Sequence, residues 1–211
     1  AFQASRPGNQ DGFIVKFNTA GNLSWATYFG TSTNDWINAI TTDTTGNIIV
    51  VGQSQGTTGL STTGAYKEIG LGLTDGFIAK FDSAGARLWS SYFGGPDNDR
   101  LFAVCTDSTN AIYISGITNS TSDISTSGAH QSIIGSATDG LIAKFDQGGG
   151  LLWSTYFGGT DNDLVQYLLF SKGKLYATGS TLSPNNITTP DAIVPVYNNS
   201  FSEGFLATFS A

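Results

Sequence analysis

The chain has 211 residues, of which 39% are hydrophobic and 12% aromatic, and this supply of apolar side chains is sufficient for a packed core. Its formal net charge of −7 argues against nucleic acid as a partner, because phosphate binding needs a surface rich in Lys and Arg. A single cysteine excludes an internal disulfide framework, and no apolar run approaches the roughly 18 residues of a membrane-spanning helix.

The first part of the chain contains four short runs typical of β-strands. In chain order they are GFIVKF (12–17), LSWATYF (23–29), a run over 36–43 and a run over 47–53. They combine alternation with β-branched and aromatic residues, and Gly, Asn or Asp separates them, which predicts strands joined by tight hairpins. No segment shows a clear apolar period of 3.6 residues, so no helix is predicted.

These runs return at a fixed interval of 64 residues. DGFIVKF (11–17) recurs as DGFIAKF (75–81), DGLIAKF (139–145) and EGFLATF (203–209), and Trp25, Trp89 and Trp153 keep the same spacing. Long segments rich in Gly, Ser and Thr precede the later copies, near 54–74, 118–138 and 181–202. The strands are apolar on both faces and must be covered twice, as they are in the stacked four-stranded sheets of a β-propeller.

The predicted fold is therefore all-β, a β-propeller built from four-stranded antiparallel blades. We expect one partial propeller domain over 1–211, with repeats over 1–64, 65–128 and 129–191 and the start of a fourth over 192–211. About three and a quarter repeats are present, since AFQ at the start matches AYK at 65–67. Open blade edges invite association, so we expect other blades of a longer chain, or further copies of this one, as partners.

The submotifs DGFIAKFDSAGARLWSSYFGG, NAITTDTTGNIIVVGQS and TTGAYK resemble the bacterial SBBP repeat, a family named for a seven-bladed β-propeller. The resemblance covers essentially the whole chain. It implies a propeller fold and a secreted or cell-surface setting in bacteria. It carries over no catalytic residues, because the family has none in common.

By analogy with related propellers, the run over 36–43 is the predicted innermost strand of a blade and the run over 87–93 the outermost. Antiparallel pairing then places the tight turns at one end of the blades. The long segments lie at the other end, together with links such as GGPDND (94–99). Since binding residues concentrate on long loops held by a rigid scaffold, a site is expected at this second end.

The Asn-Asp pair of each link has two interpretations: a cap of the turn, or oxygen ligands for calcium. The calcium hypothesis uses Asp97 with Asp99 and Asp161 with Asp163, but the first copy has Thr33 instead of the leading aspartate. No other cofactor is expected. Candidate ligand contacts at this end are Trp36, Asn98, Asp99, Arg100, Asn162 and Asp163.

Trp36 is a candidate because the repeat does not require an aromatic residue at this position, where Arg100 and Leu164 stand in the other copies. It would suit a sugar-binding platform, although a Trp packed under a loop explains it equally well.

Catalysis is not expected. His130 stands where Phe2, Tyr66 and Ile193 stand in other units, which indicates an apolar anchor. Cys105 lies in a predicted inner strand as a buried thiol. The repeated lysines are expected to be structural: Lys16, Lys80 and Lys144.

Three residues in tight turns, Thr44, Ser83 and Ser108, follow aspartates in a pattern similar to O-glycosylation acceptors of Bacteroidetes-type bacteria. Turn chemistry alone would also place Asp-Ser and Asp-Thr pairs there.

The expected function is a noncatalytic extracellular module, a scaffold or adhesion and protein-interaction surface of a larger bacterial surface or secreted protein. The alternative is a carbohydrate-binding propeller that uses the long loops, so a glycan or a surface protein is the expected ligand.

Overall fold

The computed structural model describes residues 2–195 and 201–210, and these residues form thirteen strands and no helix. The described ranges therefore contain no helical segment that could cross a membrane. In chain order the strands are β1 (Gly12–Phe17), β2 (Leu23–Phe29), β3 (Asp35–Thr42), β4 (Ile48–Ser54), β5 (Asp75–Phe81), β6 (Arg87–Phe93), β7 (Asp99–Thr106), β8 (Ile112–Thr118), β9 (Asp139–Phe145), β10 (Leu151–Phe157), β11 (Asp163–Ser171), β12 (Lys174–Thr181) and β13 (Glu203–Ser210).

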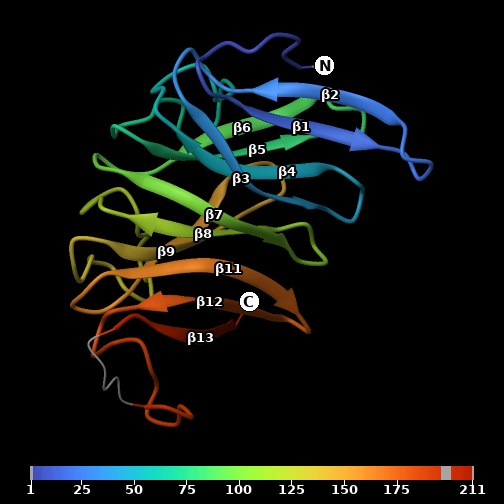
Figure 1. Cartoon of the computed structure of the whole chain (residues 1–211). Helices are drawn as coiled ribbons and strands as arrows, with labels where there is room; N and C mark the ends of the chain where they lie inside the picture. Colours follow the sequence, from blue (N-terminus) through green and yellow to red (C-terminus); the bar gives the residue numbers. More distant parts are fainter. Residues whose placement is uncertain (1, 196–200, 211) are drawn as a thin grey trace.

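The strands form four antiparallel sheets, which we call blades. Blade 1 is the pair β1-β2, blade 2 is β3-β4-β5-β6, blade 3 is β7-β8-β9-β10, and blade 4 is β11-β12-β13. Figure 1 shows them stacked from the N-terminal to the C-terminal end of the chain. The all-β class and the four-stranded antiparallel sheets are confirmed, and β3 and β6 lie at the two edges of blade 2, as the predicted strand order requires.

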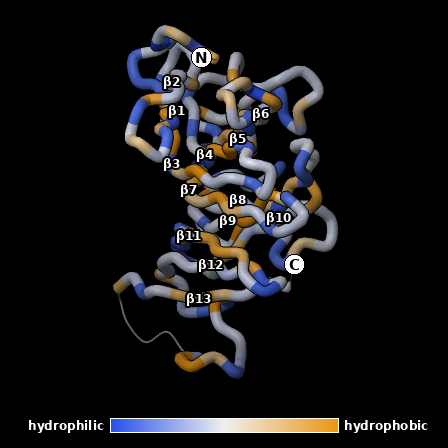
Figure 2. The backbone as a smooth tube through the Cα atoms, turned by 90° about the vertical axis from the view of Figure 1, so that its right-hand side faces the viewer, coloured by the Kyte–Doolittle hydropathy of each residue, from blue (hydrophilic) through white to orange (hydrophobic). Residues whose placement is uncertain are grey.

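A hydrophobic cluster fills each junction between adjacent blades, because the strands carry apolar side chains on both faces. Figure 2 shows hydrophobic stretches of backbone along the stacked strands. Ile14 and Phe29 of blade 1 pack with Phe77 and Phe81 of blade 2. The opposite face of blade 2 packs on blade 3, and blade 3 in turn packs on blade 4. Each complete sheet is thus covered twice, which explains why its strands lack a polar face.

A β-bulge interrupts every innermost strand, and in β3 it falls between Ile37 and Ala39. It brings the carbonyl oxygen of Trp36 so close to β4 that a Cβ on Gly52 would lie 1.8 Å from it. Only glycine fits such an approach. The same distance recurs in the two later blades, at Gly116 and Gly179.

A pair of side chains joins blade 1 to the tight turn of blade 2, and an equivalent pair joins blade 2 to blade 3. The indole Nε1 of Trp25 and the Nζ of Lys16 both donate to the backbone carbonyl of Ser83, at 3.2 and 2.7 Å. We call this contact the turn latch. It recurs one repeat later, with Lys80, Trp89 and Gln147. The latch explains why lysine and tryptophan keep the 64-residue spacing, and it gives the lysines the structural role that the sequence indicated.

Candidate functional site

At the loop-bearing end of the blades, the aspartate of each Asn-Asp link accepts a backbone hydrogen bond from within the link and a hydroxyl hydrogen bond. Asp99 is fully buried, and its Oδ2 accepts from the backbone N–H of Gly95 at 2.7 Å and from the hydroxyl of Ser120 at 2.9 Å. The equivalent aspartates, Asp35 and Asp163, are bonded in the same manner. This geometry is that of a turn cap.

The structure does not bring the predicted ligand contacts together. Trp36 lies half-buried on β3. Asn98 ends the link between blades 2 and 3, and Asp99 and Arg100 begin β7. Asn162 ends the following link, and Asp163 begins β11. Asp97 and Asp161 are exposed, whereas Asp99 and Asp163, the other members of the two predicted calcium pairs, are buried. Among the residues that the structure describes, no three acidic, histidine or cysteine side chains gather to hold a metal ion. Calcium at these two links stays a prediction.

Two buried carboxylates meet across the junction between blades 2 and 3. A Cβ on Gly94 would lie 2.6 Å from Asp75 Oδ1 and also 2.6 Å from Asp99 Oδ2, so the two oxygens are at most about 5.2 Å apart, twice that distance. Burial raises the pKa of Asp99 to about 6, with a smaller contribution from the charge of Asp75. Burial likewise raises the pKa of Asp75 and of Asp163. Sequence reasoning missed this pairing, because it treated Asp75 only as the start of a strand.

The predicted glycosylation residues Thr44, Ser83 and Ser108 all lie exposed in tight turns, at the opposite end of the blades. The hydroxyl of Thr44 donates to the side-chain oxygen of Asn110 in the next blade, at 2.8 Å. The carbonyl of Ser83 is the acceptor of a turn latch. Both residues thus take part in contacts between blades, and modification at the three positions stays a prediction.

His130 and Cys105 have the surroundings of structural residues. The His130 ring stacks on Phe157, with 6.0 Å between ring centroids, and meets Phe209 edge-on. Tyr66, which stands at the same place in the preceding repeat, makes the same kind of contact with Phe145. Burial raises the pKa of the Cys105 thiol to about 12, so the thiol is protonated at neutral pH.

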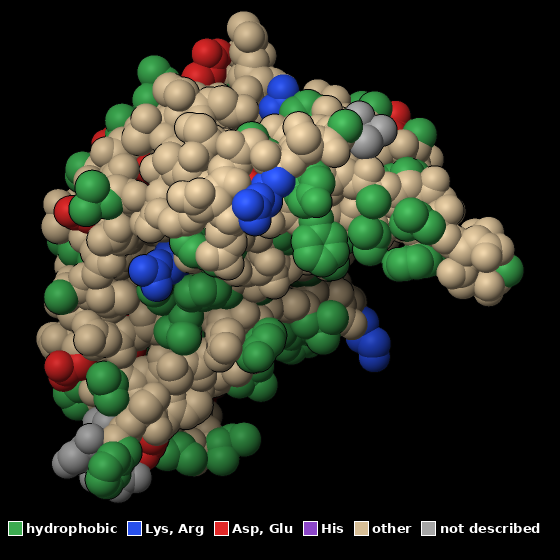
Figure 3. Space-filling view, turned by 45° about the horizontal axis from the view of Figure 1, so that its top comes forward, with side chains coloured by type: hydrophobic (Ala, Val, Ile, Leu, Met, Phe, Trp, Pro, Cys, Tyr) green, Lys and Arg blue, Asp and Glu red, His purple; other side chains and the backbone are tan. Residues whose placement is uncertain are grey.

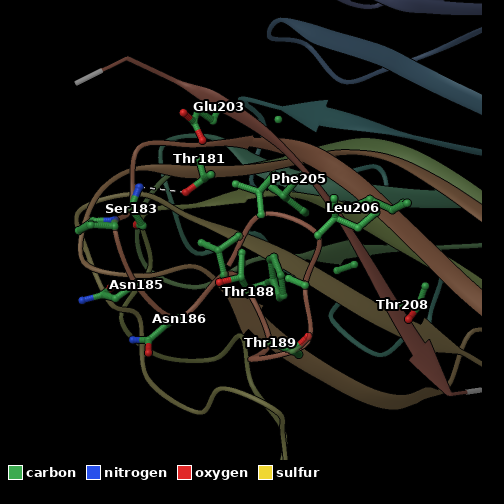
Figure 4. Close-up of a pocket in the computed structure, with 18 of the residues that line it drawn as sticks. Thr181, Ser183, Asn185, Asn186, Thr188, Thr189, Glu203, Phe205, Leu206 and Thr208 are labelled. Atoms are coloured by element: carbon green, nitrogen blue, oxygen red, sulfur yellow. Dashed lines mark hydrogen bonds between the residues drawn. The ribbon is translucent and has the colours of Figure 1, made fainter. Parts of the chain in front are cut away.

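A pocket of about 530 Å³ lies between β13 and the loop over 183–194, and no motif in the sequence indicated it (Figure 4). Figure 4 shows Phe205 and Leu206 of β13 on one side, with Thr188 and Thr189 of the loop facing them. The N–H of Ser183 donates to the Thr181 hydroxyl at the start of the loop. Apolar and hydroxyl groups therefore line this pocket together.

In blade 3 the outermost strand occupies the place that corresponds to this pocket. β10 pairs with β9 there, and the loop above it bonds to β10 through the N–H of Thr126, which donates to the Ser154 carbonyl at 3.0 Å. The loop over β13 keeps the same turn, since Ala192 N–H donates to Thr189 as Ala129 N–H does to Thr126. The pocket in blade 4 thus has the form of a slot for an outer strand.

No protein-family model matches the chain. An uncharacterized WD repeat-containing protein of Acanthamoeba polyphaga mimivirus is 28% identical to it over 177 residues. The match covers 75% of this chain but only 12% of the relative, so the chain corresponds to a small part of that protein. Together with the stacked four-stranded antiparallel sheets, this likeness indicates a β-propeller-like repeat fold.

Proposed function

We propose that the chain is a noncatalytic β-propeller module that serves as a scaffold and protein-interaction surface, with further blades of the same kind as its partners. The observation that carries this proposal is that both end blades expose residues whose equivalents form the junctions inside the chain. Phe13 and Phe17 of blade 1 are 66% and 58% exposed, whereas the equivalent Phe77 and Phe81 are fully buried against blade 1. An apolar face of this kind favours association with another blade.

The other end of the stack offers a matching face. Leu206 on β13 is 72% exposed, whereas Ile142, one repeat earlier, is fully buried against blade 4. Beside it, β13 is the last strand of its sheet among the described residues, and this position and the outer-strand slot support the addition of one more strand by backbone hydrogen bonds. In Figure 3, charged side chains are sparse and scattered, and hydrophobic side chains line a hollow.

The finer assignment within this proposal is an SBBP-type repeat in a larger bacterial protein that is secreted or displayed on the cell surface, with a role in adhesion. The 64-residue repeat with its ordered submotifs supports it. The low content of charged residues, 12%, and the single cysteine are in keeping with that setting.

Light scattering coupled to size exclusion, over a series of chain concentrations, tests the interaction surface. We expect association that increases with concentration and that is weakened in the double variant Phe13→Asp/Phe17→Asp. Leu152→Asp is the matched control, because Leu152 is also exposed, at 53%, but lies on the outermost strand of blade 3. A chain that stays monomeric at every concentration would contradict the proposal.

Carbohydrate binding is the second candidate, and the half-buried Trp36 at the loop-bearing end favours it. Aromatic rings are suitable platforms for the apolar faces of sugars. Glycan-array binding that is lost in Trp36→Ala would support this function over a pure scaffold. Absence of binding to any glycan would leave the interaction module as the function.

A further inference from the structure

Blade 2 contains a buried polar cluster in which three oxygen atoms have no hydrogen-bond partner. Asp35, Ser54 and Asp75 lie in register across β3, β4 and β5, and each is 1% exposed. Tyr92, on β6, is fully buried. Among the described residues, nothing bonds to Asp35 Oδ1, Asp75 Oδ1 or the Tyr92 hydroxyl. Buried polar atoms are nearly always partnered, so this cluster requires an explanation.

The tyrosine hydroxyl points into the cluster. Tyr92 pairs in register with Phe77, two residues beyond Asp75, so its ring and the Asp75 carboxylate lie on the same face of blade 2. Burial, together with the charges of Asp35 and Asp75, raises the pKa of Tyr92 to about 12. Both carboxylates therefore act on the phenol from close by, and the phenol remains a neutral hydroxyl at neutral pH.

The charges of this cluster are poorly balanced. Asp99 adds another carboxylate within about 5.2 Å of Asp75, as the contacts of Gly94 require. The cation that acts on Asp75 is Lys67, whose ammonium is bonded to the Gly94 carbonyl. One cation thus faces three buried aspartates, and an uncompensated buried charge is costly.

In blade 3 the residues equivalent to Asp75 and Tyr92 are bonded within the protein, although Asp99 Oδ1, the equivalent of Asp35 Oδ1, has no partner among the described residues. The Tyr156 hydroxyl donates to the Ser120 carbonyl at 2.9 Å, and both oxygens of Asp139 accept hydrogen bonds. In blade 2 the corresponding acceptor, the Gly56 carbonyl, is already bonded to the Ser54 hydroxyl. Asp11 Oδ1, one repeat before Asp75, is also unpartnered among these residues, so it is the Tyr92 hydroxyl that distinguishes blade 2.

We propose that Asp35, Asp75 and Tyr92 bind a hard cation, for which calcium is the best match. The donors are oxygens only, two of them from carboxylates, and calcium prefers such ligands. The Ser54 hydroxyl and water complete the set of oxygens. The ion would lie on the face of blade 2 that packs against blade 1, and Asp99, within about 5.2 Å of Asp75, would be its neighbour. This inference does not depend on the proposed function.

Calcium titration of the chelator-treated full chain, by calorimetry and by thermal unfolding, tests this site. We expect one strongly bound calcium per chain and a rise in Tm of roughly 5–10 °C at about 100 times the Kd. Asp75→Asn should weaken the affinity at least tenfold, because it removes one of the two charged ligands. Tyr92→Phe, which keeps the packing of the ring, should weaken it by a smaller factor.

Asp139→Asn is the matched control in blade 3 and should leave calcium binding unchanged. Equal losses in Asp139→Asn and Asp75→Asn would overturn the assignment, since calcium would then bind elsewhere. A wild-type chain that binds no calcium and shows no change in Tm would also overturn it, and would indicate that water or a proton satisfies the cluster. If Asp75→Asn fails to fold, Tyr92→Phe still decides, because an unchanged affinity in that variant contradicts the site.

Discussion

The two ends of the blades hold their buried aspartates in opposite electrostatic states. At the tight-turn end, Asp43 forms an ion pair with Lys80 at 2.9 Å. Burial by itself would raise the pKa of Asp43, but hydrogen bonds from Asn47, Lys80 and Thr45 hold it well below its usual range. At the loop-bearing end, burial raises the pKa of Asp99 to about 6, and no ion pair among the described residues involves it.

Both aspartates cap a turn, so capping is not the source of the difference. Asp43 Oδ1 accepts from the backbone N–H groups of Thr45 and Asn47, and Asp99 Oδ2 accepts from that of Gly95. What differs is burial, which is the main cause of the raised pKa of Asp99, and then the charge nearby: a lysine faces Asp43, and a second carboxylate, Asp75, faces Asp99. The same local motif thus stabilises the anion at one end and the neutral acid at the other.

The largest expected effect comes from removing the cation at the tight-turn end. Lys80→Met leaves the carboxylate of Asp43 buried without its partner, which should destabilise the chain by about 3–5 kcal/mol in chemical denaturation. Lys144→Met is the control, because Lys144 lies over the ring of Tyr113, 5.0 Å from its centroid. Its loss should cost only about 0.5–1 kcal/mol. Equal losses of stability in the two variants would show that the ion pair contributes no more to the free energy of unfolding than the contact of Lys144 with Tyr113 does.

The next effect is a dependence of stability on pH that arises at the loop-bearing end. The folded state binds the Asp99 proton more tightly than the unfolded state, whose ordinary pKa is 3.8. This contribution is therefore complete below about pH 4 and is lost as the pH rises through 6, a change of about 3 kcal/mol. Asp75 and Asp163, whose pKa is also raised, act in the same direction.

Asp99→Asn tests this assignment, because an amide oxygen accepts the same hydrogen bonds from Gly95 and Ser120 but does not titrate. Urea unfolding at pH 4 and at pH 8 should show a smaller loss of stability in the variant than in the wild-type chain. Asp43 has the opposite sign, since stability from its lowered pKa is present above about pH 4 and lost in more acidic solution. An identical pH profile in variant and wild type would contradict the role of Asp99.

The smallest expected effect comes from adding a methyl group to the tight turn that packs against the Trp25 ring of the turn latch. Gly85 and Gly21 occupy the same turn in successive repeats, with φ of 86° and 79°. A Cβ on Gly85 would lie 2.9 Å from the Trp25 ring, whereas one on Gly21 would meet nothing within 4 Å. Both substitutions by alanine strain the backbone, but Gly85→Ala should cost roughly 1–2 kcal/mol more. Thermal unfolding compares them, and equal shifts in Tm would mean that the Trp25 contact contributes nothing.

The sequence predicted the strands well, because period, turn residues and repeat all pointed to the same elements. The predicted bounds 75–81 and 87–93 are those of β5 and β6, and β3 begins one residue before the predicted 36–43. The 64-residue register also identified His130 as an anchor and the lysines as structural. These inferences needed only comparison of equivalent positions along the chain.

The site could be predicted only in part, because its contacts join positions far apart in the sequence. The Asn-Asp link indicated a turn cap, but nothing local showed that Asp75 would face Asp99 across a junction. Likewise, the loss of the Tyr92 partner depends on whether Ser54 or the tyrosine reaches one particular carbonyl. Which of the two hydroxyls reaches the carbonyl is decided by three-dimensional packing. It cannot be predicted from the repeat, because equivalent positions in the repeat carry similar residues.

The turn latch has a consequence for how such a chain changes in length. Its two donors lie in one repeat and its acceptor in the next, 58 residues beyond Trp25 and 67 beyond Lys16. Every internal unit therefore supplies one acceptor to its predecessor and one donor pair to its successor. A unit of 64 residues can be duplicated or deleted between two others without leaving an unpaired donor. Arrays of this kind can gain or lose whole blades while each remaining junction keeps its contacts.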